Sequence, residues 1–194
     1  FRTTVHDNYT HDNDVDGLYL EGNVEAYANT TIINDGAGIV LTTSAGNTIA
    51  RDNYVNRNGT GIYARTGQVL HNRVVGNTGA GIYLDYAAVL VSANSVYGNA
   101  RGIEVANYQG GATLQNNLVY DNTNQGIYVH GAGTSGSNGT LLVNNTVHHE
   151  VGSAVKLENN GNNVRLYNNI IYINGGLGIE VIGNVTGFDS NYNN

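Results

Sequence analysis

The chain has 194 residues, with 27 glycines, 14 tyrosines and no Cys, Met, Pro or Trp. The missing cysteines exclude disulfides and cysteine-ligated metals, and no apolar run of about 18 residues is present to span a membrane. A net charge of −7, with Lys156 as the one lysine, argues against a phosphate-binding surface, so we expect no nucleic-acid partner.

A phrase of two asparagines, a glycine and an aliphatic triplet returns eight times along the chain. The first asparagine column is Asn8, Asn29, Asn53, Asn72, Asn94, Asn117, Asn145 and Asn169. The second column, five residues later, is Asn13, Asn34, Asn58, Asn77, Asn99, Asn122, Glu150 and Asn174. The triplets are residues 18–20, 39–41, 62–64, 82–84, 103–105, 127–129, 155–157 and 179–181. Successive triplets begin 20 to 28 residues apart, a period typical of solenoids.

Within each repeat, three short runs alternate apolar and polar residues, the pattern of strands with one buried face. The residue three positions before the first asparagine is apolar throughout: Val5, Ala26, Ala50, Val69, Val91, Leu114, Leu142 and Leu166. We predict an all-β, right-handed parallel β-helix of about eight coils, each of 20–28 residues, forming one domain over residues 1–194. Because the chain lacks Met and residues 187–194 resemble the start of another coil, we expect a segment of a longer protein.

The asparagines and glycines are expected at the bends between strands. Each ladder asparagine should point inward, bond to the turn and to the asparagine of the next coil, and tolerate a left-handed φ. The glycine before each triplet should provide either a positive φ or a close approach of two backbones.

The outward face of the triplets is the candidate functional surface. Its central column is Tyr19, Val40, Tyr63, Tyr83, Glu104, Tyr128, Lys156 and Glu180, and the residues just after the triplets include Arg65, Asp85, His130 and Glu158. Tyrosine rings suit sugar contacts, and the charged neighbours could neutralise a carboxylate and transfer protons. We predict substrate contacts from Tyr19, Tyr63, Glu104, Lys156 and Glu158. Loops 42–46, 110–111, 131–139 and 159–163 are expected to wall one side of a groove.

A purely structural interpretation of this face is also open. Tyrosine rows stabilise neighbouring strands, and Lys156 beside Glu180 would then form an ordinary ion pair. Arg65 and Asp85 could likewise pair with each other.

Two further clusters suggest metal chemistry. The segment 12–17 resembles the start of a calcium-binding loop, which makes Asp12, Asp14 and Asp16 a candidate Ca²⁺ site, although the twelfth position is not the glutamate of an EF-hand. His148 and His149 lie where the second asparagine column fails. Because strand neighbours point to opposite faces, we expect them at a solvated strand end rather than on one metal ion.

Residues 116–129, with Asn117, Asn122 and Gly126 before Ile127-Tyr128-Val129, resemble the right-handed β-helix repeat family, which includes polysaccharide lyases and alginate epimerases. The resemblance covers nearly the whole chain and implies the fold rather than an activity. The Tyr-Gly-Phe-Asp-Pro-His segment typical of the epimerases is absent, because the chain has no proline.

The resulting hypothesis is a secreted or cell-surface protein that binds a polysaccharide. If it is an enzyme, we expect β-elimination or epimerisation of a uronate, with Arg65 or Ca²⁺ as carboxylate neutraliser, His130 as base and Tyr83 or Tyr128 as acid. The alternative is a non-catalytic stalk or adhesin segment that stacks end to end with other coils or neighbouring domains.

Overall fold

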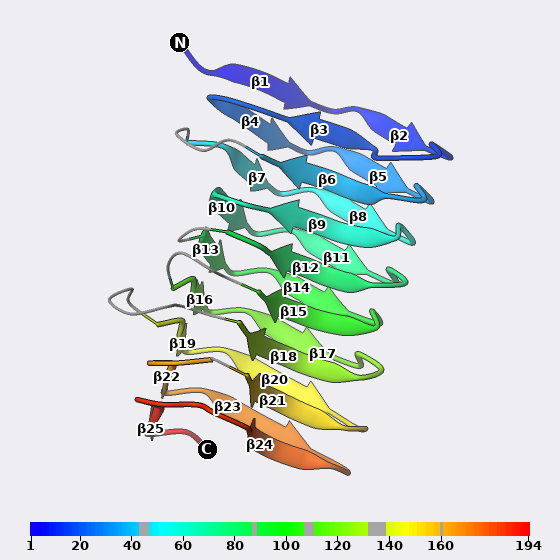
Figure 1. Cartoon of the computed structure of the whole chain (residues 1–194). Coiled ribbons are helices and arrows are strands. Elements are labelled where there is room, and N and C mark those ends of the chain that lie inside the picture. The colour runs from blue at the N-terminus through cyan, green and yellow to red at the C-terminus, as the bar shows by residue number, and fades with distance from the viewer. Residues whose placement is uncertain (43–46, 87–88, 107–110, 132–138, 160) are drawn as a thin grey trace.

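The computed structural model describes residues 1–42, 47–86, 89–106, 111–131, 139–159 and 161–194. Within these ranges every regular element is a β-strand, as the repeat pattern predicts. The strands form three parallel sheets that run the length of the molecule (Figure 1).

Each coil contributes one strand to each sheet. The first sheet contains β1 (Thr3–His6), β4 (Val24–Tyr27), β7 (Ile49–Arg51), β10 (Gly67–Leu70), β13 (Val89–Ser92), β16 (Thr113–Gln115), β19 (Leu141–Val143), β22 (Arg165–Tyr167) and β25 (Asp189–Asn191). The second contains β2 (Tyr9–His11), β5 (Thr30–Ile32), β8 (Tyr54–Asn56), β11 (Arg73–Val75), β14 (Ser95–Tyr97), β17 (Leu118–Tyr120), β20 (Thr146–His149) and β23 (Ile170–Ile173). The third contains β3 (Leu18–Leu20), β6 (Ala37–Leu41), β9 (Thr60–Ala64), β12 (Ala80–Leu84), β15 (Arg101–Val105), β18 (Gln125–His130), β21 (Ser153–Glu158) and β24 (Leu177–Ile182).

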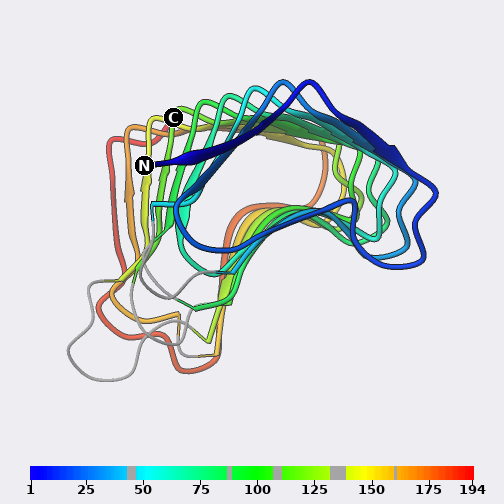
Figure 2. The same cartoon turned by 90° about the horizontal axis from the view of Figure 1, so that it is seen from above.

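Viewed along the axis, successive coils overlie one another (Figure 2). Strand pairing keeps repeat positions in register: Ile62 pairs with Ile82, and Ile82 with Ile103. This arrangement is a parallel β-helix, and the predicted fold is confirmed.

The core consists of inward columns of aliphatic side chains. Ile39, Ile62, Ile82, Ile103 and Ile127 form one such column and are fully buried. The predicted column before the first asparagine is also inward, since Ala26 to Leu166 are buried and Val5 packs against the core from the end coil. Because each coil repeats the same side-chain types, apolar burial recurs from coil to coil, except in the last coil, where Ile179 and Val181 are exposed.

The first asparagine column forms a continuous hydrogen-bonded ladder. The Nδ2 of Asn72 donates to Oδ1 of Asn94 at 3.1 Å, and Asn94 donates in turn to Asn117 at 3.0 Å. The same Oδ1 of Asn94 accepts the backbone N–H of Asn72 at 2.9 Å. Repeated along the column, these bonds satisfy buried amides that would otherwise be costly. Asn193 extends this ladder one position beyond the eight predicted.

The left-handed bends fall one residue earlier than predicted. Positive φ occurs at Ala28, Ala93 and Asn116, each immediately before a ladder asparagine, and at Ile33 before the second column. The asparagine therefore does not itself adopt the left-handed conformation. Its side chain bonds across the bend that the preceding residue makes, as when Asn94 Nδ2 reaches the carbonyl of Ser92 at 3.1 Å.

The glycine before each triplet is required for close approach rather than for positive φ. A Cβ at Gly61 would lie 2.3 Å from the carbonyl oxygen of Gly81 and 2.5 Å from Cγ1 of Val74. Of the two predicted roles for this column, close packing is the one the structure supports.

The second ladder runs from Asn13 to Asn122 and changes at Glu150. Here β20 extends to His149, which is completely buried and donates from Nε2 to the carbonyl of Asn124 at 3.0 Å. Its Nδ1 has no hydrogen-bond partner among the described residues. The expected solvated strand end is therefore wrong for His149, because one added strand residue turns its side chain inward; the left-handed bend moves to Gly152.

Candidate functional site

The outward triplet column lies on the third sheet in the predicted register. Tyr19 pairs with Val40, Val40 with Tyr63, and Tyr63 with Tyr83. Farther along, Glu104 pairs with Tyr128, and Tyr128 with Lys156. The predicted residues therefore do share one face, in an order set by the helical winding.

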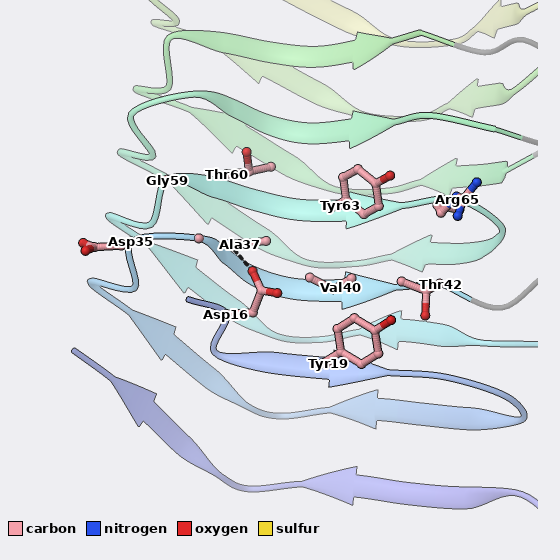
Figure 3. A pocket seen from close by; sticks show the side chains of 11 residues that line it. Asp16, Tyr19, Asp35, Ala37, Val40, Thr42, Gly59, Thr60, Tyr63 and Arg65 are labelled. Carbon is pink, nitrogen blue, oxygen red and sulfur yellow. Dashed lines mark hydrogen bonds between the residues drawn. The ribbon is translucent and has the colours of Figure 1, made fainter. Parts of the chain in front are cut away.

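A groove of about 430 Å³ lies over the first part of this face (Figure 3). Val40 forms its floor between the rings of Tyr19 and Tyr63, and we call it the Val40 groove. The remaining lining residues are Asp16, Asp35, Gly36, Ala37, Thr42, Gly59, Thr60 and Arg65. It exists because Val40 stands where neighbouring coils carry tyrosine, and its short side chain leaves the space between the rings open.

Beside the groove, Tyr63, Arg65 and Asp85 form a linked group. The phenol of Tyr63 donates to Oδ2 of Asp85 at 2.5 Å, and Nε of Arg65 lies 3.9 Å from the same oxygen. Burial and this bond raise the pKa of Tyr63 to about 12. The ring of Tyr63 also stacks on that of Tyr83, with centroids 5.6 Å apart. The open alternative of an Arg65–Asp85 ion pair is therefore what the structure contains.

The second group centres on Glu104, which is only 6% exposed. His130 donates from Nε2 to its Oε1 at 3.0 Å, and Nη1 of Arg101 lies 2.9 Å from its Oε2. Burial alone would raise the pKa of Glu104, but the bonds from His130 and Arg101 outweigh it and hold that pKa below the ordinary value. Glu104 is thus an ionised anchor that fixes the orientation of the imidazole.

Tyr128, Lys156 and Glu158 continue this group on the next strands. Nζ of Lys156 lies 2.8 Å from Oε2 of Glu158, and the phenol of Tyr128 donates to the same oxygen at 3.0 Å. These contacts lower the pKa of Glu158, whereas burial and the Glu158 bond raise the pKa of Tyr128 to about 12. The rings of Tyr128 and His130 stack with centroids 4.4 Å apart. We call Arg101, Glu104, Tyr128, His130, Lys156 and Glu158 the Glu104 cluster.

The structure divides the predicted catalytic set. Arg65 follows β9, whereas His130 ends β18 three strands farther along, so roughly 14 Å of axial rise separates them. Arg65 therefore cannot neutralise a carboxylate beside His130. Arg101 is the nearby cation, and it was not predicted from the sequence. It could have been found from its position two residues before the triplet of the same strand, from which its side chain reaches Glu104.

Two other sequence expectations concern the same face. Lys156 pairs with Glu158, while Glu180 accepts a hydrogen bond from Ser153, so the considered Lys156–Glu180 pair is not formed. The predicted walls at 42–46, 110–111, 131–139 and 159–163 lie wholly or partly outside the described residues.

Two of the three candidate calcium ligands are engaged in other contacts. Asp12 contacts Nδ1 of His11 at 2.6 Å, and Oδ1 of Asp16 accepts the backbone N–H of Ala37 at 2.7 Å. Across the described parts of the chain, no three His, Cys, Asp or Glu side chains are grouped to hold a metal. The Ca²⁺ site at Asp12, Asp14 and Asp16 stays a prediction.

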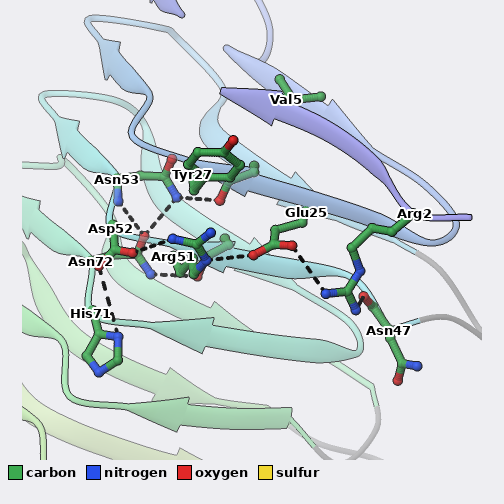
Figure 4. A network of polar contacts seen from close by, with 12 residues as sticks. Arg2, Val5, Glu25, Tyr27, Asn47, Arg51, Asp52, Asn53, His71 and Asn72 are labelled. Atoms are coloured by element: carbon green, nitrogen blue, oxygen red, sulfur yellow. Dashed lines mark hydrogen bonds and ion pairs between the residues drawn. The ribbon is translucent and has the colours of Figure 1, made fainter. Parts of the chain in front are cut away.

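A separate polar network covers the N-terminal coils of the first sheet (Figure 4). Glu25 accepts from Nε of Arg51 at 2.6 Å and from Nη1 of Arg2 at 3.3 Å, and Arg51 also reaches Asp52 at 2.7 Å. The bond from Arg51 is the main reason that the pKa of Glu25 is lowered. Tyr27 lies beneath the Arg51 guanidinium, at 4.4 Å. These groups satisfy one another and link neighbouring coils.

Comparison with known proteins agrees with the fold. The family model described as right handed beta helix region matches residues 61–194, and the chain belongs to this family. A second model, described as periplasmic copper-binding protein (NosD), matches residues 2–89. No curated protein matches the sequence.

Two solved structures from Azotobacter vinelandii share the architecture. The mannuronan C-5 epimerase AlgE4 A-module superposes with a TM-score of 0.79 and 18% identity, covering 95% of this chain and 57% of that one. The mannuronan C-5 epimerase AlgE6 A-module gives a TM-score of 0.70 and 21% identity, covering 98% and 58%. The chain thus spans little more than half the length of either structure.

The segment similar to the copper-binding family does not fit copper. Copper prefers His, Cys or Met ligands, yet this segment has no Cys or Met. Its three histidines are each beside a different aspartate: His6 by Asp7, His11 by Asp12 and His71 by Asp52. We derive no copper chemistry from it. No helix of sufficient length and apolarity to cross a membrane occurs in the described ranges.

Proposed function

We propose that this chain is an extracellular polysaccharide-binding β-helix, forming one domain, whose third-sheet face holds a sugar polymer along the rod axis. The observation that carries the proposal is the Val40 groove, a tyrosine-flanked space in register with the Glu104 cluster on the same sheet. Tyrosine offers an apolar ring for sugar C–H groups and a hydroxyl for sugar oxygens. The similarity to two mannuronan C-5 epimerase modules supports a carbohydrate ligand.

If the face is catalytic, the Glu104 cluster has the suitable chemistry. Glu104 holds Nε2–H of His130, which leaves Nδ1 as the nitrogen that accepts a proton from the carbon beside a uronate carboxylate. Arg101 or Lys156 offsets the charge of that carboxylate, and Tyr128, kept protonated by its raised pKa, is the hydroxyl acid. Proton return to the carbon gives epimerisation, whereas loss of the glycosidic oxygen gives β-elimination.

A non-catalytic stalk or adhesin segment is the second candidate, and one observation favours it. The polar side chains of this face satisfy one another, as in the Tyr63–Asp85 and Tyr128–Glu158 bonds. Such pairing stabilises adjacent coils without any ligand. End-to-end stacking and a supporting Ca²⁺ ion at Asp12, Asp14 and Asp16 belong to this candidate equally.

Affinity electrophoresis of the chain through gels containing alginate, pectate, a galactomannan or dextran tests binding. We expect retardation in at least one gel, and unretarded migration in all of them would end the polysaccharide proposal. Absorbance of unsaturated products, and NMR of the recovered uronate polymer, then separate elimination, epimerisation and binding alone. Glu104→Gln should abolish either reaction while leaving retardation in the gel.

A further inference from the structure

The tyrosine row on the third sheet is interrupted by Val40 and again by Glu104, and Val40 is the interruption with a small apolar side chain. Tyr63 and Tyr83, on adjacent strands, stack directly with centroids 5.6 Å apart. Tyr19 and Tyr63 are two strands apart, on either side of Val40, as Figure 3 shows. The Val40 groove is therefore bounded by a ring on each side and by an aliphatic floor.

The width of the gap selects the shape of the occupant. Two strand spacings place the flanking rings roughly 9–10 Å apart. A planar aromatic ligand in van der Waals contact with both would need only about 7 Å. A puckered saturated ring, with C–H bonds directed to both faces, fills the larger gap better. The groove volume of about 430 Å³ is in the range of roughly 300–1,000 Å³ that small-molecule sites occupy.

The polar groups at the two ends select the charge of the occupant. Asp16 lies beside Val40; its Oδ1 already accepts from Ala37, which leaves Oδ2 to accept a ligand hydroxyl. Asp35 is exposed at the same end. At the other end, the charge of Arg65 is partly offset by Asp85 at 3.9 Å. Carboxylates therefore outnumber the single guanidinium, and an anionic ring is disfavoured.

Resting on the polysaccharide proposal above, we propose that the Val40 groove is a binding site for one neutral hexopyranose unit, held between Tyr19 and Tyr63 with its hydroxyls donating to Asp16. The Glu104 cluster, three strands beyond Val40, carries Arg101 and Lys156 and is better suited to an acidic unit. The polymer that fits the whole face is therefore one containing neutral sugars as well as uronates.

The groove can be tested directly by filling it with the side chain that the adjacent strands carry at this position, which is tyrosine. Val40→Tyr restores the residue found at the equivalent position of the flanking coils and should fold, since the side chain points outward on the sheet. Val40→Thr has nearly the same shape as valine and is the matched control. Isothermal titration with mannohexaose and cellohexaose as neutral probes, and with hexamers of mannuronate and galacturonate as acidic probes, measures binding.

We expect a neutral hexamer to bind the natural chain and Val40→Thr alike, and to bind Val40→Tyr at least tenfold more weakly. Asp35→Asn should reduce the ratio of affinities for neutral and acidic hexamers, because it removes one carboxylate from the groove. Equal binding of that hexamer by Val40→Tyr would overturn the groove assignment and leave the polysaccharide proposal standing. Preference for an acidic hexamer whose binding is weakened by Val40→Tyr would overturn the sugar class assigned to the groove. Binding of no probe, together with no retardation in any polysaccharide gel, would overturn both.

Discussion

At the scale of single residues, the most informative groups are the two phenols of the third sheet that donate to carboxylates. Tyr63 and Tyr128 each lie on the outward column, and each has a pKa raised to about 12 by burial and by its acceptor. A phenol with a raised pKa is a poor base near neutral pH but remains a hydrogen-bond donor. This state suits the acid role proposed for Tyr128 and the ring-contact role proposed for Tyr63.

These two phenols should lose their protons at a higher pH than an ordinary tyrosine does. We predict that Asp85→Asn moves the pKa of Tyr63 from about 12 part of the way toward the ordinary value of 10.0, because the variant removes the negative charge of the acceptor while burial remains. Asp189→Asn is the control on the first sheet: Asp189 accepts from the half-buried Tyr167 and raises its pKa, so this variant should change the titration of Tyr167 and leave that of Tyr63 unchanged. Tyrosinate absorbance or NMR against pH measures the change, and an unchanged late-titrating fraction in Asp85→Asn would contradict the assignment.

Because the folded pKa of these phenols exceeds the unfolded value, the folded state binds more protons between pH 10 and 12. Their contribution to stability is therefore complete below pH 10 and is lost as pH rises toward 12.

The contribution of Glu104 to stability has the opposite dependence on pH, because it is lost in acid rather than in base. We predict that Glu104→Gln lowers the free energy of unfolding at neutral pH by roughly 1–3 kcal/mol, because Arg101 and His130 lose a charged acceptor. The pKa of Glu104 is lowered in the fold, so this contribution is present above the ordinary glutamate value of 4.5 and disappears as pH falls through the folded value. Urea unfolding at several pH values checks this. A difference that persists undiminished in strong acid would contradict the account.

The outward positions of the candidate residues could be predicted from the sequence, but their partners could not. Strand alternation places Tyr63, Glu104 and Tyr128 on one face without further information. Which cation contacts which anion depends on how far each side chain reaches across neighbouring strands. For this reason Arg101, and not Arg65, shares Glu104 with His130. The Val40 groove was also missed, although valine in a tyrosine column was a visible signal.

At the scale of elements, the asparagine ladder is the main polar support of the bends. We predict that Asn94→Ala lowers the free energy of unfolding by at least about 2 kcal/mol, because it leaves two donors of Asn72 without their acceptor and removes one donor each from the carbonyls of Val69 and Ser92. Asn8→Ala, at the exposed start of the ladder, should cost less than about 1 kcal/mol because water can replace its bonds. Denaturant unfolding measures the free energy of unfolding of both variants. Equal decreases for Asn94→Ala and Asn8→Ala would contradict a cooperative interior ladder.

The glycine column gives a second test on the same element. A Cβ at Gly81 would lie 2.6 Å from Cγ1 of Val96 and 2.7 Å from Nδ2 of Asn99. We predict that Gly81→Ala destabilises the chain by about 1–3 kcal/mol through overpacking. Gly98→Asn is the matched control, because φ is +66° there and the nearest atom is 3.6 Å away, so asparagine fits. Thermal unfolding should show a lowered Tm for Gly81→Ala alone.

The strands and both ladder columns could be predicted because their pattern repeats eight times. The left-handed position was misplaced by one residue, since Asp, Ala, Ile, Arg and His all occupy it and no residue type marks it. The altered bend at Glu150 was visible as a break in the column. Its consequence, a buried His149, depends on a single added strand residue and is not encoded in composition.

At the scale of the whole molecule, the winding sets the distances between possible sites. Each coil advances by roughly 4.8 Å, so Val40 and Glu104, three coils apart, are separated by about 14 Å along one face. A ligand that contacts both must be an extended polymer lying along the axis. This is why the proposed function concerns polysaccharides, and why a small isolated substrate would use only one of the two places.

Amide NMR of the isotopically labelled chain, titrated with the polysaccharide that retards it most, tests the central claim most directly. The account predicts shift changes in β3, β6, β9, β15 and β18 of the third sheet, including Val40 and Glu104, with the first and second sheets little changed. Changes confined to the second sheet, where Tyr97, Tyr120, His148 and Tyr172 form an aromatic column on paired strands, would contradict it.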